Sequence, residues 1–242
     1  MLVLGISTAT AQVGCAIGGH EGVLASFTSA RDRRHAETLA PAIQFVTGQA
    51  RVPLREISAI AVDVGPGLFT GLRVGVSTAK ALASTLRVPM IGVSSLDLLA
   101  FPVRWSDRRI VSVVDARRGE VFFAFYRQVP GGVQRLSPHR VGTPAELCSE
   151  IQAGGGEVLA VGDGAIRHRD ELSELTRVEV GDGCVAYPSP GSLVELAHAQ
   201  ALREEFVQPW EVEPIYLRKA DAEINWSVRE RPGDVPHDLP PA

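Results

Sequence analysis

A glycine-rich loop is the part of this sequence best suited to hold a ligand. Residues 65–71 read Gly-Pro-Gly-Leu-Phe-Thr-Gly and lie between a predicted buried strand and a predicted helix. Free backbone N–H groups and the helix dipole can bind an anion at such a junction, so Gly65, Gly67, Thr70 and Gly71 are candidate nucleotide- or anion-binding residues. The spacing matches neither a dinucleotide fingerprint nor a P-loop. A tight turn that needs glycine for its backbone freedom explains the loop equally well.

The helix that follows this loop has one face of very small side chains. That face carries Gly71, Gly75, Ala79 and Ala83, and the bulky apolar residues beside it are Leu68, Phe69, Leu72 and Val76. Small side chains let another backbone approach closely, which increases dispersion contacts. Packing on the helix's own sheet would also favour Gly and Ala, although glycine inside a helix costs roughly 1 kcal/mol relative to alanine. Because apolar residues lie on more than one face, we predict that this helix binds a partner.

No set of residues has the spacing of a catalytic or metal centre. His35 lacks the second histidine of a helical HExxH zinc site, because Leu39 stands at that position. Residues 92–96, GVSSL, lack the second glycine of a nucleophile elbow. Asp115 and Glu120 flank a predicted hairpin turn, where carboxylates are more often caps or solvated charges than catalysts. We therefore predict no catalytic residue, no metal ligand and no cofactor.

Composition narrows the class of protein. The chain has 242 residues with 24 Lys and Arg against 28 Asp and Glu, a net charge of −4, which argues against holding nucleic acid by bulk electrostatics. The cysteines Cys15, Cys148 and Cys184 are far apart and form no CxxC pair, which fits a reducing compartment. We find no signal-peptide pattern and no run of about 18 apolar residues. We expect a cytoplasmic protein without a membrane span.

The hydrophobic pattern predicts alternating strands and helices. Strands are predicted at 2–6, 13–17, 23–28, 57–64, 90–93, 110–115, 121–127, 133–141 and 158–161, and helices at 35–50, 70–86, 95–101, 144–152, 165–175 and 191–206. Pro41 either bends the first helix or begins its regular part. The order strand-strand-strand-helix-strand-helix occurs before about residue 103 and again after about residue 109, which indicates a duplicated architecture.

This duplication predicts an α/β fold of two lobes, each a mixed sheet with helices. We expect an N-terminal lobe at 1–103 and a C-terminal lobe at 104–188. A helix and a strand at 189–218 return to pack on the lobes, and 219–242 form a flexible tail. Such a pair of lobes is compatible with the actin-like, sugar-kinase-like (ASKHA) superfamily, in which nucleotide sits between the lobes.

Several segments together resemble one bacterial family. Residues 65–83, GPGLFTGLRVGVSTAKALA, closely resemble the signature of the TsaB (YeaZ) family. Supporting matches are LVLGISTAT at 2–10, RRHAETLAPAI at 33–43, DARRGEVF at 115–122, GDG at 162–164 and EPIYLR at 213–218. The resemblance covers about residues 1–218 and implies an actin-like two-lobed fold.

The resemblance also implies a function. Members take part in making threonylcarbamoyladenosine beside the anticodon of tRNA, as a scaffold rather than as the catalyst. The paralogue TsaD carries the metal and the transferase site, the ATPase TsaE joins the pair, and the scaffold also forms homodimers. Contact with tRNA is then indirect, through the complex.

The interface implied by this resemblance falls on helices 35–50 and 70–86. Its predicted residues are His35, Leu39, Ile43, Phe69, Leu72, Gly75, Val76, Ala79 and Ala83. We expect Gly75→Leu to abolish the heterodimer while leaving the monomer folded. Ser7 stands where the family usually has aspartate, and a hydroxyl cannot supply the negative charge that a hard cation prefers, which favours a non-catalytic subunit.

Two other functions compete with this one. A nucleotide-binding kinase or ATPase of the same fold would use the loop at 65–71, but Ser7 and the lack of an acid–base pair count against it. A peptidase is disfavoured because the sequence contains neither a metal-ligand set nor a nucleophile elbow.

Overall fold

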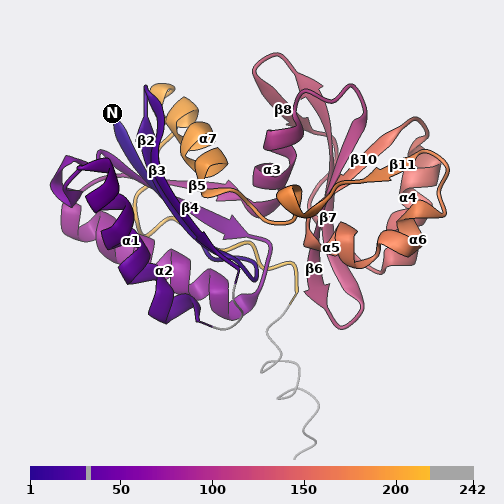
Figure 1. The fold of residues 1–242 in the computed structure, drawn as a ribbon, viewed down its shortest axis with the longest axis horizontal. Helices are drawn as coiled ribbons and strands as arrows, with labels where there is room; N and C mark the ends of the chain where they lie inside the picture. Colours follow the sequence, from indigo (N-terminus) through magenta and orange to yellow (C-terminus); the bar gives the residue numbers. More distant parts are fainter. Residues whose placement is uncertain (31–33, 219–242) are drawn as a thin grey trace, which may run out of the picture.

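The computed structural model describes residues 1–30 and 34–218, and these form two lobes, each built on one sheet (Figure 1). The predicted tail at 219–242 lies outside the described residues. The first sheet contains β1 (Leu2–Ser7), β2 (Val13–Gly19), β3 (Gly22–Ser29), β4 (Ala59–Gly65) and β5 (Met90–Ser94), in the order β3-β2-β1-β4-β5. The first three strands are antiparallel, and β4 and β5 continue the sheet in parallel with β1.

Helices cover both faces of the first sheet. Helices α1 (His35–Ala50) and α2 (Phe69–Leu86) lie on one face, and α7 (Pro190–Leu202) lies on the other (Figure 1). Side chains alternate along β1, so Leu4 and Ile6 pack under α1 and α2 while Val3 packs under α7. Strands β1, β2 and β4 are therefore buried on both faces, whereas the edge strand β3 is partly exposed.

The second sheet repeats this topology. It contains β6 (Arg109–Arg117), β7 (Glu120–Val129), β8 (Gly132–Arg135), β10 (Val158–Val161) and β11 (Val178–Val180), in the order β11-β10-β6-β7-β8, with β9 (Arg140–Gly142) paired to β7. As in the first lobe, an antiparallel meander is followed by two parallel strands. Helices α4 (Pro144–Gly154), α5 (Asp163–Arg167) and α6 (Arg169–Ser173) cover one face. The predicted two-lobed α/β fold with duplicated sheets is confirmed.

Some predicted elements differ in extent. The predicted strand at 133–141 is two short strands, β8 and β9, because Pro138 between them cannot donate to the sheet ladder. The predicted helix at 165–175 is interrupted at His168, whose φ of −106° and ψ of 30° are not helical. Pro41 lies within α1, which begins six residues before it at His35. No strand forms at 214–218, where Pro214 lacks an N–H group.

A short helix, α3 (Ser95–Ala100), lies between the two lobes (Figure 1). Leu98 packs into the cluster beneath α7 in the first lobe. Leu96 and Leu99 pack instead against Ile110 and Tyr126 of the second sheet. The sequence order assigns this helix to the first lobe, whereas its packing joins both lobes into one body. No helix among residues 1–30 and 34–218 has the length and apolar character needed to cross a membrane.

Candidate partner-binding surface

The small-residue face of α2 is turned inward, onto its own sheet. Ala79 and Ala83 are fully buried in the core of the first lobe. A Cβ atom on Gly71 would lie closer than 3.0 Å to the carbonyl oxygen of Thr8, and one on Gly75 equally close to Thr8 Oγ1. The small residues therefore allow β1 to approach the helix closely. The prediction that this face binds a partner is wrong.

Most of the predicted interface residues share this buried position. Those inside the first-lobe core are Leu39, Ile43, Leu72, Gly75, Val76, Ala79 and Ala83. A helix that lies on a sheet must bury its apolar face there, so these side chains are already covered. His35 and Phe69 remain half-buried, and the Nε2 atom of His35 lies 2.8 Å from the carbonyl oxygen of Thr10, which accepts a hydrogen bond from it.

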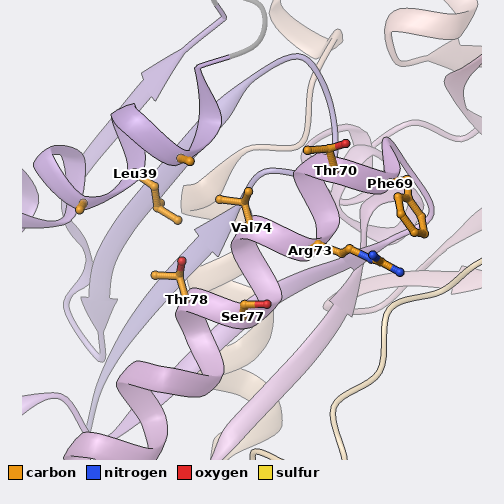
Figure 2. A pocket seen from close by; sticks show the side chains of 9 residues that line it. Leu39, Phe69, Thr70, Arg73, Val74, Ser77 and Thr78 are labelled. Atoms are coloured by element: carbon orange, nitrogen blue, oxygen red, sulfur yellow. The ribbon is translucent and has the colours of Figure 1, made fainter.

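The outward faces of α1 and α2 form a groove instead (Figure 2). Its volume is about 540 Å³, and its lining residues are Ala36, Leu39, Ala40, Phe69, Thr70, Arg73, Val74, Ser77 and Thr78. Leu39 forms the buried floor, while Ala40 and Ser77 are exposed on opposite walls. Because Ala40 and Ser77 have small side chains, they leave the groove open to solvent between the two helices. Of the predicted interface residues, Leu39 and Phe69 line this groove, whereas the small residues Ala40 and Ser77 on its walls were not predicted.

The groove, which we call the α1–α2 groove, continues toward the second lobe. A neighbouring cavity of about 700 Å³ shares Phe69, Thr70 and Val74 with it and is also lined by His35 and Arg117. Arg117 belongs to the β6–β7 hairpin of the second lobe. A partner seated on the two helices can thus reach both lobes.

The glycine-rich loop is occupied by the protein's own backbone. The Gly65 amide donates to Asp63 Oδ1 at 3.0 Å, and the Leu68 amide donates to the Ala9 carbonyl at 2.7 Å. That same carbonyl would clash with a Cβ atom on Gly67. Gly65 also adopts a φ of +95°, which favours glycine. Backbone carbonyl oxygens therefore lie beside Gly67 and Gly71, which favours the tight-turn interpretation, and the anion site at Gly65, Gly67 and Gly71 stays a prediction.

Thr70, the remaining residue of the predicted anion site, is exposed and lines the α1–α2 groove. It therefore belongs to the helix surface rather than to a phosphate-binding loop.

A buried carboxylate lies beside Ser7. Asp63 is 1% exposed and accepts hydrogen bonds from Ser7 Oγ at 2.8 Å, from Ser95 Oγ at 2.5 Å and from the Gly65 amide. Burial raises the pKa of Asp63 to about 6, although the three donors oppose this effect. An aspartate at position 7 would place a second carboxylate against the first. Ser7 therefore serves as a donor that joins β1 to β4 and α3.

A smaller cavity of about 340 Å³ between the lobes contains Asp115 and Asp163. Asp115 Oδ2 pairs with Arg167 at 2.8 Å and with Arg117 at 3.3 Å, and the Asp115 amide donates to Asp163 Oδ1 at 3.1 Å. Burial raises the pKa of Asp163 to about 6. Within the described ranges no three His, Cys, Asp or Glu side chains converge on a metal position. Asp115 is thus committed to two arginines and Asp163 accepts a hydrogen bond from a backbone amide, an arrangement that does not favour a magnesium–nucleotide complex.

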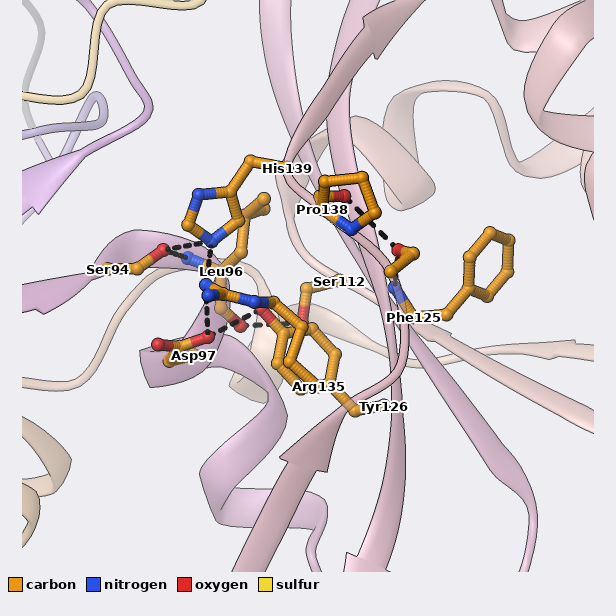
Figure 3. Close-up of polar contacts among 10 residues, drawn as sticks. Ser94, Leu96, Asp97, Ser112, Phe125, Tyr126, Arg135, Pro138 and His139 are labelled. Carbon is orange, nitrogen blue, oxygen red and sulfur yellow. Dashed lines mark hydrogen bonds and ion pairs between the residues drawn. The ribbon is translucent and has the colours of Figure 1, made fainter.

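A polar cluster beside α3 joins Ser94 and Asp97 to Tyr126, Arg135 and His139 of the second lobe (Figure 3). Ser94 Oγ lies 3.2 Å from His139 Nε2, which Arg135 also contacts, and Tyr126 Oη donates to Asp97 Oδ1 at 2.7 Å. Asp97 binds tyrosine and arginine rather than the imidazole, so no Ser-His-Asp triad is formed. Ser94 Oγ also accepts from the Leu96 amide and caps α3. The cluster is structural and gives no support to a peptidase.

Comparison with known proteins places this architecture in one family. A family model described as TsaD, tRNA N6-adenosine threonylcarbamoyltransferase, matches residues 22–226. The Escherichia coli "tRNA threonylcarbamoyladenosine biosynthesis protein TsaB" is 32% identical over 222 residues, 90% of this chain and 95% of that protein. The chain belongs to the TsaB/YeaZ family.

Other TsaB/YeaZ proteins agree with this assignment. The Bacillus subtilis TsaB protein is 29% identical over 228 residues, covering 93% of this chain and 98% of the relative. A solved structure of YeaZ from Pseudomonas aeruginosa superposes with a TM-score of 0.78 at 26% identity, over 89% of this chain and 99% of that one. The similarity therefore spans both lobes of the TsaB/YeaZ fold.

Proposed function

We propose that this chain is a non-catalytic subunit of the complex that transfers a threonylcarbamoyl group to the adenosine beside the anticodon of tRNA. Family membership supports the reaction, because close relatives are named for threonylcarbamoyladenosine biosynthesis. The non-catalytic role is supported by the commitment of Asp63, Asp97 and Asp115 to structural partners. The chain then acts in the cytoplasm and meets tRNA indirectly.

The partner in this proposal is a TsaD-type catalytic paralogue seated on the α1–α2 groove. The observation that carries it is an open groove on the outward faces of two helices whose inward faces are already buried. Apolar side chains at Phe69 and Val74 offer hydrophobic contact there, and the small Ala40 and Ser77 admit a partner helix. A second copy of the chain can compete for the same surface, and a TsaE-type ATPase joins the assembled pair.

Filling the groove should block the paralogue. Ser77→Tyr places a bulky uncharged side chain on the exposed wall, where it meets none of the core. We expect the Kd for the TsaD-type paralogue of the same organism to rise at least about tenfold, which is about 1.4 kcal/mol, because the partner can no longer approach. Isothermal titration calorimetry measures the change.

Ser149→Tyr is the matched control, since Ser149 is an exposed serine on helix α4 of the second lobe. Its Kd should equal that of the unmodified chain. Equal binding by the Ser77 and Ser149 variants would show that the paralogue docks elsewhere.

A further inference from the structure

Three side chains form an exposed stack at one end of the α1–α2 groove. The guanidinium carbon of Arg73 lies 3.8 Å from the centre of the Phe69 ring, and the Arg73 side chain extends toward that ring in Figure 2. The Phe69 and Tyr216 ring centres are 5.3 Å apart with an interplanar angle of 40°. Arg73 is exposed, and Tyr216 is 45% exposed. The stack is therefore accessible to a partner on the groove.

The C-terminal segment holds this stack in place. Val212 is buried in the first-lobe core, and the Ile215 amide donates to the Val64 carbonyl at 2.7 Å. Two residues after Tyr216, Arg218 pairs with Glu120 of the second lobe at 2.8 Å. Contacts of Ile215 before Tyr216 and of Arg218 after it thus hold this part of the chain in place. This arrangement orders Phe69 and Arg73 before a partner arrives, which lowers the entropy lost on binding.

The charge of the surface indicates what Arg73 binds. Helix α2 is described in full, and Arg73 and Lys80 are its charged residues, with no carboxylate among them. Within the described residues, Arg73 has a ring contact with Phe69 and no ion pair. A guanidinium group stacked on a ring keeps its in-plane N–H donors available for a carboxylate.

We propose that Arg73, held in the stack with Phe69 and Tyr216, binds a carboxylate of the partner and thereby selects the TsaD-type paralogue over a second copy of this chain. The inference rests on the proposed function. In a twofold pairing of identical chains, each copy presents Arg73 and Lys80 on α2 but has Glu37 as the only carboxylate on α1. Self-pairing leaves unbalanced positive charge, which an acidic partner neutralises.

Reversing the charge of Arg73 tests this selection. For Arg73→Glu we expect at least about tenfold weaker binding of the purified TsaD-type paralogue at 50 mM salt, and loss of most of the salt dependence shown by the unmodified chain. Arg73→Lys retains the charge but not the planar group, so its Kd should be intermediate. The same variants are compared by sedimentation velocity without the paralogue, where Arg73→Glu should self-associate more strongly.

Arg177→Glu is the control, because Arg177 is exposed near β11 of the second lobe. Its affinity should match that of the unmodified chain. If Arg73→Glu binds as tightly as Arg177→Glu, or self-associates no more strongly, the inference is overturned while a block by Ser77→Tyr would still uphold the docking surface. If the unmodified chain does not bind the paralogue, the proposed function itself fails.

Discussion

Gly75→Leu should prevent stable folding rather than remove a partner contact. A Cβ atom at this position would lie closer than 3.0 Å to Thr8 Oγ1, and the rest of a leucine side chain would have to fit between α2 and β1. Thr8 is 1% exposed, and its hydroxyl donates to the Gly71 carbonyl at 2.7 Å, so it cannot turn away without breaking a buried hydrogen bond. We expect the free energy of unfolding to fall by at least about 3 kcal/mol, measured by urea denaturation.

Gly48→Ala is the control for this substitution. Gly48 lies in α1, and a Cβ atom there would meet nothing within 4 Å. Because alanine loses less conformational freedom than glycine when a helix forms, this variant should be more stable by about 0.5–1 kcal/mol. A Gly75→Leu chain that unfolds at the same urea concentration as the unmodified chain would contradict the inward placement of the small-residue face.

Asp63→Asn should change how stability depends on pH. Burial raises the pKa of Asp63 from its usual 3.8 to about 6, so the folded chain keeps this proton to higher pH than the unfolded chain. The stability that this proton supplies is complete at pH values below 3.8, the pKa of Asp63 in the unfolded chain, and is lost as the pH rises through about 6. Between pH 4 and pH 8 the unmodified chain should therefore lose about 2 kcal/mol relative to the uncharged variant.

The measurement is urea denaturation of both chains at intervals across this pH range. Asp163, whose pKa burial also raises, is present in both chains, so its effect cancels in the difference. Asp107→Asn removes a carboxyl group from an exposed position and should leave the pH dependence of the unmodified chain in place. If the difference in the free energy of unfolding between Asp63→Asn and the unmodified chain stayed constant from pH 4 to pH 8, Asp63 would not titrate as a buried group.

The packing of α3 shows where chain order misleads. The sequence places 95–101 next to β5 and hence in the first lobe. In the structure Leu96 and Leu99 cover the face of the second sheet that lies opposite α4, while α7, from the far end of the described chain, covers the corresponding face of the first sheet. Which sheet a short apolar helix covers depends on long-range contacts, which its own periodicity does not contain.

The buried carboxylate was equally hidden from sequence reasoning. Ser7, Asp63 and Ser95 are far apart along the chain, and each is an ordinary strand-end or helix-start residue by itself. The meeting of β1, β4 and α3 brings them within hydrogen-bond distance. An aspartate at position 7 would place a second carboxylate beside Asp63, whereas Ser7 donates a hydrogen bond to it.

The sequence by itself determined most of the strands and helices, the duplication of the lobes and the family, because periodicity, turn residues and the motif at 65–83 are local features. It also located a helix face built for close approach. Only the tertiary structure decided that β1, through Thr8, occupies that face and that the opposite face forms the groove. Helical spacing defines two faces of α2, but the neighbour that covers each one is set by packing between residues distant in the chain.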